Sequence, residues 1–331
     1  MHSLLKQSTT LWIVGLGSLA LALLFALLAG AALNEREALW QSTVSRQHAL
    51  QRQALHSAQL NLEDQAELLA QTLAADIPLL EQVNQASLLM RTGTALDPAL
   101  QPIREQLLAH LSPRWQSLQR SYPFDLTVHL SNHDVLLRVH QPDFFGDRPE
   151  SAGRMLQDVE TIGSSRAGLG PGDNGLVVRA ISPLRIPGEA NSVPIGGLEV
   201  SLNLTQNLQQ LDRELDAGIA LLLERRTRPA GDRDDTAPSA SSWYFEGFSR
   251  PEVQDWQAKQ LLPDPEAGDS VKLLRDGGTT YLLNQLVLSG YAAIGGKSAP
   301  AAVALTWSDV SEAYALHRHE QHWLVGKWLL A

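Results

Sequence analysis

The chain has 331 residues, room for two ordinary domains with accessory helices, and a formal net charge of −10 at pH 7. This negative balance argues against a nucleic-acid backbone as the main partner, because such a backbone is bound through clustered Lys and Arg. The sequence contains no cysteine, which excludes disulfides, thiolate metal sites and a cysteine nucleophile.

The first expected element is a membrane-spanning helix over residues 11–33. This run of 23 residues carries no charged side chain. As a helix it would measure about 34 Å, which is enough to cross a bilayer core. Lys6 before the run favours a cytoplasmic N-terminus. A cleaved signal peptide is the alternative, because Ala29-Gly30-Ala31 would suit a signal peptidase, although the run is longer than a usual signal-peptide core.

A long stalk helix is predicted over residues 34–78. The segment is polar, rich in Gln and Ala, and free of Pro and Gly up to Asp76. Leu55, Leu62 and Leu69 repeat every seven residues and give one narrow apolar stripe. Such a stripe suits either a seam between two copies or packing against the chain's own domain. We expect a weak parallel homodimer through this stalk.

Two short helices and a hairpin are expected next. Asp97-Pro98 and Ser112-Pro113 each place an N-cap residue before a proline at the first helical position. Residues 125–130 and 135–140 then alternate as strands around a four-residue turn. The register predicts an apolar face with the pairs Leu130–Val135, Val128–Leu137 and Leu126–Val139. It predicts a polar face with the pairs His129–Leu136, Thr127–Arg138 and Asp125–His140.

Two later strands could continue that polar face. Residues 176–181 carry a single charge, Arg179, and residues 195–204 alternate with Glu199 on the polar side. The Gly-rich segment 167–175 before them lacks a Walker Lys-Ser/Thr and the dinucleotide-binding spacing. We therefore expect it to form a turn-rich wall over the sheet and not a phosphate cradle.

The polar face predicts the floor of a small-ligand pocket. Arg138 and Arg179 could each bind a carboxylate through paired, charge-assisted hydrogen bonds. Glu199 and Asp125 could take an ammonium group or hold the arginines in place. The expected ligand is a small anion or zwitterion, such as a carboxylate or an amino acid. Two alternatives are a solvated sheet face and a purely structural network of Arg and acidic residues. The candidate ligand-binding residues are Arg138, His140, Arg179, Glu199, Asp125, Thr127 and Asp147.

The second half of the chain predicts another small antiparallel sheet. Strands are expected at residues 219–226 and 243–248, in a hairpin turning at 276–278, and at 299–307. Residues 227–242 are predicted to form a loop. From Val310 the pattern is helical and ends in the start of a second membrane helix. His317, His319 and His322 in this helix are not expected to bind a metal.

The order of these elements resembles the extracytoplasmic double Cache, PAS-like sensory domains of bacterial transmembrane receptors. The resemblance covers residues from about 34 to about 314 and is most specific in a Leu-Arg-x-His-x-Pro-x-x-x-Gly-Asp segment. The matching positions are Leu137, Arg138, His140, Pro142, Gly146 and Asp147, then Arg179 with Pro183, and Gly197 with Glu199. Gly170 departs from the pattern, because a Glu often stands there in the family.

The resemblance implies an α+β fold with two Cache modules and a receptor in the bacterial inner membrane with its main domain in the periplasm. The expected divisions are a cytoplasmic N-terminus (1–10), a transmembrane helix (11–33), a stalk (34–78), a membrane-distal module (79–205), a membrane-proximal module (206–309) and a juxtamembrane helix (310–331).

Three functions compete for such a chain. A sensor would bind a small molecule and pass the signal to an output such as a diguanylate cyclase, a histidine kinase or a chemoreceptor. A stand-alone, membrane-anchored binding protein is the alternative. An exported enzyme is disfavoured, because the sequence has no Gly-x-Ser-x-Gly, no His-Glu-x-x-His and no Cys. We expect no catalytic residue, metal or cofactor in this chain.

Overall fold

The computed structural model describes residues 2–90, 95–120, 123–172, 175–186, 192–224, 242–296 and 299–330. The side chains of residues 2–20, 324, 325 and 327–330 lie outside this description, as does the expected loop from residue 227 to 241. The chain forms two compact units. One consists of Met1–Gln51, Val271–Leu283 and Ser308–Ala331, and the other of Arg52–Ser270 and Asn284–Trp307.

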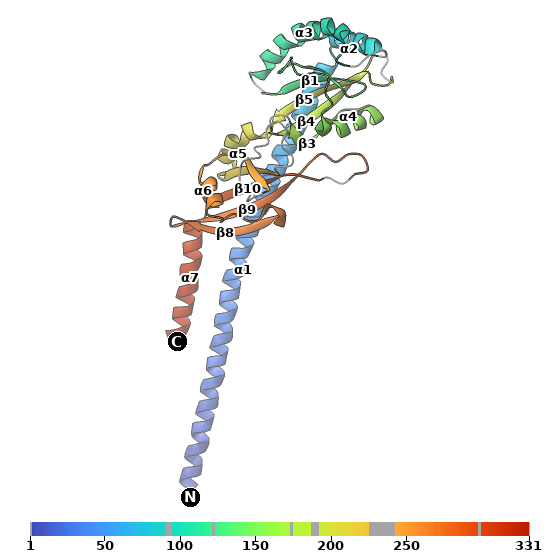
Figure 1. The fold of residues 1–331 in the computed structure, drawn as a ribbon. Coiled ribbons are helices and arrows are strands. Elements are labelled where there is room, and N and C mark those ends of the chain that lie inside the picture. The colour runs from blue at the N-terminus through green and yellow to red at the C-terminus, as the bar shows by residue number, and fades with distance from the viewer. Residues whose placement is uncertain are drawn as a thin grey trace. The chain divides into compact units, whose positions relative to one another are not determined.

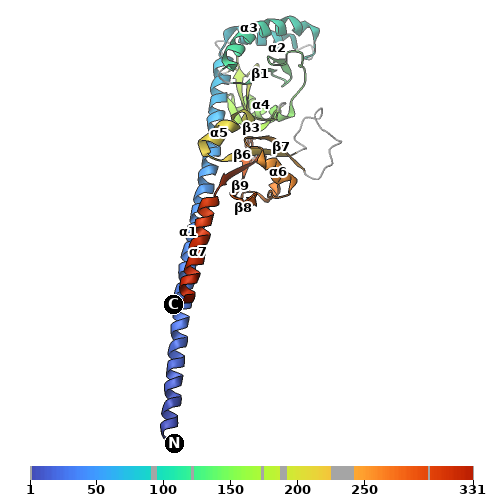
Figure 2. The same cartoon turned by 90° about the vertical axis from the view of Figure 1, so that its left-hand side faces the viewer.

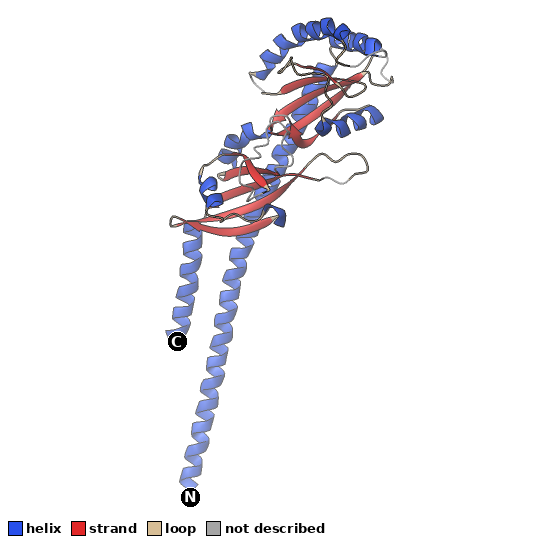
Figure 3. Cartoon of the chain, in the orientation of Figure 1, coloured by secondary structure: helices blue, strands red, loops and turns tan. Residues whose placement is uncertain are grey.

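Helices and two five-stranded sheets make up the fold (Figure 1, Figure 3). The helices are α1 (His2–Ala74), α2 (Ile77–Met90), α3 (Gln101–Gln119), α4 (Glu150–Ile162), α5 (Leu208–Leu215), α6 (Glu252–Ala258) and α7 (Ser311–Leu330). The strands of the first sheet are β1 (Asp125–Leu130), β2 (Val135–Arg138), β3 (Arg166–Gly172), β4 (Gly175–Leu184) and β5 (Gly196–Asn203). Those of the second are β6 (Gly218–Glu224), β7 (Trp243–Phe248), β8 (Ser270–Asp276), β9 (Thr279–Ser289) and β10 (Pro300–Asp309). The predicted α+β class with two antiparallel sheets is confirmed.

Helix α1 contains both the expected membrane segment and the expected stalk. It runs without a break to Ala74, close to the predicted end of the stalk. Within the described part of the chain, no helix combines the length and the apolar character needed to cross a membrane. Residues 11–20 of the expected membrane segment have side chains outside that part.

The apolar stripe of α1 packs within its own unit. Leu55 and Leu73 are buried in a core shared with the first sheet, and Leu62 and Leu69 are partly buried against it. Burial of this stripe removes apolar surface from water and so fixes the helix on its domain. Of the two roles that the sequence left open for the stripe, the structure assigns packing on the chain's own domain.

The first sheet has the strand order β2-β1-β5-β4-β3 and is covered on both faces. Its apolar face carries Val128, Leu198 and Val200 into the core with α1, α2 and α3. On the other face, α4 packs on Ile181 of β4. A sheet covered on both faces buries polar side chains as well as apolar ones, so the outward positions of β1, β4 and β5 are not solvated.

The hairpin register agrees with the prediction in part, and β2 ends at Arg138, two residues before its expected end. Thr127 pairs with Arg138 and Val128 pairs with Leu137, as expected. The expected pairings of His129 with Leu136 and of Leu130 with Val135 are both wrong, because a bulge follows Val128 and His129 pairs with Val135. A bulge inserts one residue into one strand and increases the local twist. The polar face nevertheless retains His129.

The Gly-rich segment forms a strand, and the prediction of a turn-rich wall is wrong. Its first part is β3, which pairs along β4 from Arg166 opposite Ile181 to Gly172 opposite Gly175. This strand lies at the edge of the sheet, where proline and glycine are tolerated because one row of backbone groups has no neighbouring strand. At Gly168 a side chain would collide with Tyr291.

One expected helix start is correct and the other is wrong. Asp97 caps the short helix Pro98–Leu100, and its carboxylate accepts a hydrogen bond from the backbone N–H of Ala99. Ser112 does not start a helix, because α3 continues through Pro113. Pro113 has no N–H to donate to the carbonyl of Ala109. Both residues lie on the exposed side of α3, where water can take the place of that donor.

The second sheet has the order β7-β6-β10-β9-β8. Its expected hairpin turn is confirmed, with Gly277 and Gly278 both at positive φ between β8 and β9. The expected C-terminal helix is α7, which lies beside α1 within their common unit (Figure 2). Arg36 forms an ion pair with Glu320 at 2.8 Å, and Trp40 stacks on His317.

Candidate functional site

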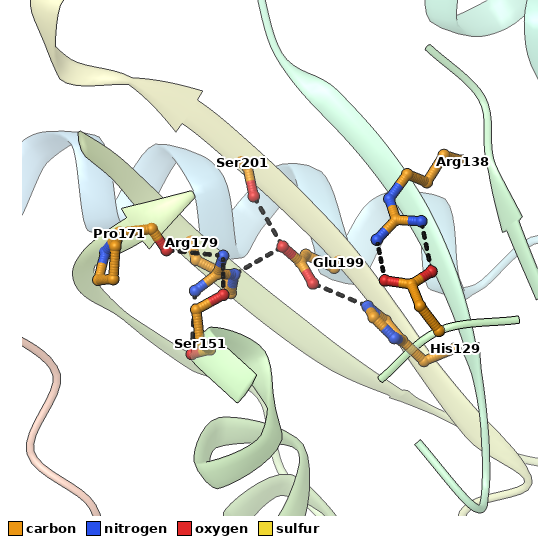
Figure 4. Close-up of polar contacts among 8 residues, drawn as sticks. His129, Arg138, Ser151, Pro171, Arg179, Glu199 and Ser201 are labelled. Atoms are coloured by element: carbon orange, nitrogen blue, oxygen red, sulfur yellow. Dashed lines mark hydrogen bonds and ion pairs between the residues drawn. The ribbon is translucent and has the colours of Figure 1, made fainter. Parts of the chain in front are cut away.

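The predicted polar face brings side chains from four strands together (Figure 4). Thr127 of β1 lies between Arg138 of β2 and Glu199 of β5. In the neighbouring row, Ser201 of β5 lies between β1 and Arg179 of β4. Because strands of one antiparallel sheet hold these positions in register, the residues stand on one surface, as strand alternation predicts.

This surface is buried, so the interpretation as a solvated sheet face is wrong. His129, Arg138, Arg179 and Glu199 are all buried, although charged side chains are seldom buried unless paired. The two arginines are paired with different acidic residues, Arg138 with Asp147 and Arg179 with Glu199.

Arg179 and Glu199 form the centre of a hydrogen-bond network (Figure 4). Arg179 Nε donates to Glu199 Oε1 at 2.6 Å, and the hydroxyl of Ser201 donates to the same oxygen at 2.9 Å. His129 Nε2 lies 2.7 Å from Glu199 Oε2. Burial alone would raise the pKa of Glu199, but the charge of Arg179 and the hydrogen bond with His129 hold that pKa well below its ordinary value. Glu199 is therefore ionised at neutral pH and pairs with Arg179.

The remaining donors of Arg179 also have partners. Its Nη1 donates to the carbonyl of Ser151 at 3.1 Å, and its Nη2 donates to the Ser151 hydroxyl at 3.3 Å and to the carbonyl of Pro171 at 3.1 Å. Arg179 thereby joins the first turn of α4 to the edge strand β3. These contacts indicate that Arg179 has a structural role, because they link the elements that surround the site.

Arg138 is paired differently. Its Nη1 and Nη2 donate to the two oxygens of Asp147, both at 2.7 Å, and Nη1 also donates to the carbonyl of Phe144 at 3.0 Å. The hydrogen bond from Arg138 holds the pKa of Asp147 below its ordinary value, against the opposing effect of burial. The loop that follows β2 thus places Asp147 against Arg138 at the end of that strand.

Two imidazoles on this surface have buried nitrogens without partners. Nδ1 of His129 and Nδ1 of His140 contact no hydrogen-bond partner among the described residues. The other nitrogen of His140 lies 3.9 Å from Asp125 Oδ2. Most buried polar atoms are hydrogen-bonded, so such nitrogens are suited to a ligand atom or a water molecule.

The cavity among these residues is small. Its volume is about 20 Å³, enough for about one water molecule. A side chain at Gly170 would project toward the cavity's Arg179, with its Cβ 3.9 Å from Nη1. The lining residues are Asp125, Thr127, His129, Arg138, His140, Pro149, Gly172, Val177, Arg179, Glu199 and Ser201.

A much larger groove, of about 500 Å³, lies between α1 and α5 in the same unit. Its lining includes the apolar Leu62 and Leu211 and the carboxamide residues Asn61, Gln65 and Gln210. Its volume is in the usual range for ligand pockets. The sequence did not predict this groove, because it forms between helices that are far apart along the chain.

Three residues of the network were missing from the predicted site. His129 and Ser201 share the face of Thr127 and Glu199 by strand alternation, so the sequence carried a signal for both. Ser151 contacts Arg179 from the start of α4, and no sequence pattern indicated it. Within the described chain, no group of three or more His, Cys, Asp or Glu side chains has the arrangement of a metal site.

The sequence matches no known family model and no curated protein sequence. Solved structures similar to the chain include the periplasmic domain of LuxQ from Vibrio cholerae, at 10% identity and a TM-score of 0.44, covering 80% of this chain and 99% of that one. The extracellular domain of the putative histidine kinase rpHK1S-Z16 has 12% identity and a TM-score of 0.31, covering 74% and 95%. The ligand-binding domain of the Pseudomonas aeruginosa amino acid chemoreceptor PctB, in complex with L-Arg, has 16% identity and a TM-score of 0.23, covering 77% and 91%.

Proposed function

We propose that the chain is the ligand-sensing region of a membrane-bound signal-transduction receptor, and that it binds a small carboxylate or amino acid on the polar face of the first sheet. The observation that carries this proposal is the cluster of two buried guanidinium groups and two imidazoles with unpartnered Nδ1 atoms. Perturbed, buried polar groups gathered around a cavity are typical of binding sites.

Arg138 is the proposed anion-binding group, and Arg179 is the proposed support. A guanidinium binds a carboxylate through two parallel hydrogen bonds, which is the geometry that Arg138 uses toward Asp147. Arg179 is held by Glu199 and by the start of α4. Asp125, partly exposed beside His140, could receive the ammonium group of an amino acid.

The topology and output are part of the same proposal. Residues 11–33 cross the inner membrane, the N-terminus is cytoplasmic, and the module from residue 79 to 205 senses the ligand in the periplasm. The module from residue 206 to 309 transmits the signal to an output, for which a diguanylate cyclase is our first choice. A stand-alone anchored binding protein is the alternative. A periplasm-active reporter fused after Gly268 is expected to be active, and activity of only a cytoplasm-dependent reporter there would contradict the topology.

We also propose a homodimer through α1, by a surface other than the buried stripe. Leu60 and Leu68 of α1 are exposed, whereas Gln51 is buried and hydrogen-bonded to Ser308. A single cysteine at Leu68 is expected to crosslink two copies, and one at the buried Ala70 serves as the control. Equal, negligible crosslinking at Leu60 and Leu68 would contradict the dimer.

The binding proposal is tested by a thermal-shift screen of the purified chain against small carboxylates and amino acids, followed by calorimetry. Arg138→Ala is expected to weaken binding roughly ten- to hundredfold, because a hydrogen bond to a charged group contributes about 1.5–3 kcal/mol. Arg138→Lys keeps the charge without the paired geometry, so it covers the case in which the alanine variant does not fold. Gln65→Ala reports on the groove between α1 and α5. Binding that is insensitive to Arg138 but weakened by Gln65→Ala would move the site to the groove.

A further inference from the structure

The ion pair of Arg138 and Asp147 lies at the anion-binding site of the proposed function, on which its role depends. The cavity beside Arg138 holds about 20 Å³, which is room for about one water molecule and not for a carboxylate ligand. Both terminal nitrogens of Arg138 already donate to Asp147. A ligand carboxylate can therefore form paired bonds with Arg138 only after Asp147 has released it.

The two partners are unequally exposed. The side chain of Arg138 is 7% exposed and that of Asp147 is 52% exposed. A buried guanidinium needs an anion beside it, because desolvated charge is strongly unfavourable without a partner. A half-exposed carboxylate is already in contact with water, so turning it outward changes its solvation little. Asp147 is thus the partner that can leave, provided that another anion takes its place.

The loop does not depend on the Asp147 side chain for its position. The backbone N–H of Val135 donates to the carbonyl of Asp147 at 2.9 Å, and the N–H of Gly146 donates to the carbonyl of Val135 at 2.8 Å. The guanidinium of Arg104 lies over the ring of Phe145 at 3.9 Å. These contacts hold residues 145–147 through the backbone and a neighbouring side chain, so the carboxylate can rotate while the loop stays in place.

We propose that Asp147 is a built-in competitor, an internal carboxylate that occupies the anion-binding position on Arg138 until a ligand carboxylate replaces it. The exchange conserves charge in the site, because one carboxylate leaves as another enters. The ligand concentration needed for binding rises in inverse proportion to the fraction of time that Arg138 is free of Asp147. Asp147 therefore sets the threshold of the sensor, and its side chain becomes solvated in the bound state.

Acetate has the same carboxylate group as the Asp side chain. It can therefore test this exchange although the natural ligand is not identified. In the full chain, Asp147→Ala removes the competitor, and Asp143→Ala is the matched control on an exposed carboxylate of the same loop. We expect about 100 mM acetate to raise the melting temperature of Asp147→Ala by about 3–6 °C more than that of the control, for a dissociation constant on the order of 10 mM. Chloride at the same ionic strength should have no such effect.

The location of the acetate is tested by adding Arg138→Met to Asp147→Ala, which should abolish the extra shift. Equal acetate shifts in wild type, Asp143→Ala and Asp147→Ala would overturn the proposal, as would a shift that survives Arg138→Met. If the alanine variant does not fold, the same titration on Asp147→Asn decides the question. A different result would contradict the proposed function, namely that amino acids or carboxylates bind with equal affinity to wild type and to Arg138→Ala.

Discussion

Glu199→Gln should strongly destabilise the first sheet. Glu199 is buried, and it bonds Arg179 at 2.6 Å, His129 at 2.7 Å and Ser201 at 2.9 Å. Glutamine keeps the shape but leaves the buried charge of Arg179 without a counter-anion. Removing one partner of a buried ion pair costs about 3–5 kcal/mol, and we expect the lower value because the amide oxygen still accepts a hydrogen bond. For a unit of this size, this corresponds to a fall in melting temperature of about 6–12 °C.

The assay is thermal unfolding followed by circular dichroism, with Asp143→Asn as the control for loss of an exposed negative charge. The double variant Arg179→Met/Glu199→Leu removes both charges, so it should be more stable than the single variant Glu199→Leu. Two results would contradict the proposed contribution of the buried Arg179–Glu199 pair to stability. One is a Glu199→Gln melting temperature within about 1 °C of the control, and the other is a double variant whose loss equals the sum of the two single losses.

Three further predictions concern pH, the edge strand and one long-range contact. Because folding lowers the pKa of Glu199 from 4.5, its contribution to stability is complete above that pH and is lost as the pH falls below it, so Glu199→Gln should flatten the melting-temperature profile below pH 4.5. Gly170→Glu, which directs a carboxylate at Arg179, should weaken binding of an anionic ligand by about tenfold in calorimetry, whereas Gly170→Gln should have a smaller effect. Tyr291→Phe removes a 2.7 Å bond from its hydroxyl to Asp158 Oδ2, and denaturant unfolding should show a loss of about 1–2 kcal/mol; an unchanged midpoint would contradict that bond.

Strand alternation predicted the hairpin pairs Thr127–Arg138 and Val128–Leu137, but not the pairing beyond the bulge that follows Val128. The two-residue period of a strand decides which face each side chain is on. The strand register places Thr127, Arg138 and Glu199 side by side in one row. The alternation could not reveal that this row is buried, because burial depends on α4, which packs there through Ile181.

The features that the sequence did not predict depend on contacts between distant segments. Residues 166–172 have the composition of a loop, but pairing with β4 makes them a strand, and tertiary pairing outweighs the weak strand propensity of Gly and Pro. Ser151 contacts Arg179 across 28 positions of sequence. The pairing of Asp147 with Arg138 is local, yet its geometry depends on the turn at Gly146, whose φ is +84°.

Binding of a small anion at Arg138 can be seen in a structure of the chain with the tightest-binding carboxylate or amino acid from the screen. We expect a ligand carboxylate paired with both terminal nitrogens of Arg138, the Asp147 side chain turned toward solvent, and the bond between Arg179 and Glu199 unchanged. A ligand in the groove between α1 and α5, with Arg138 still paired to Asp147, would contradict binding at Arg138.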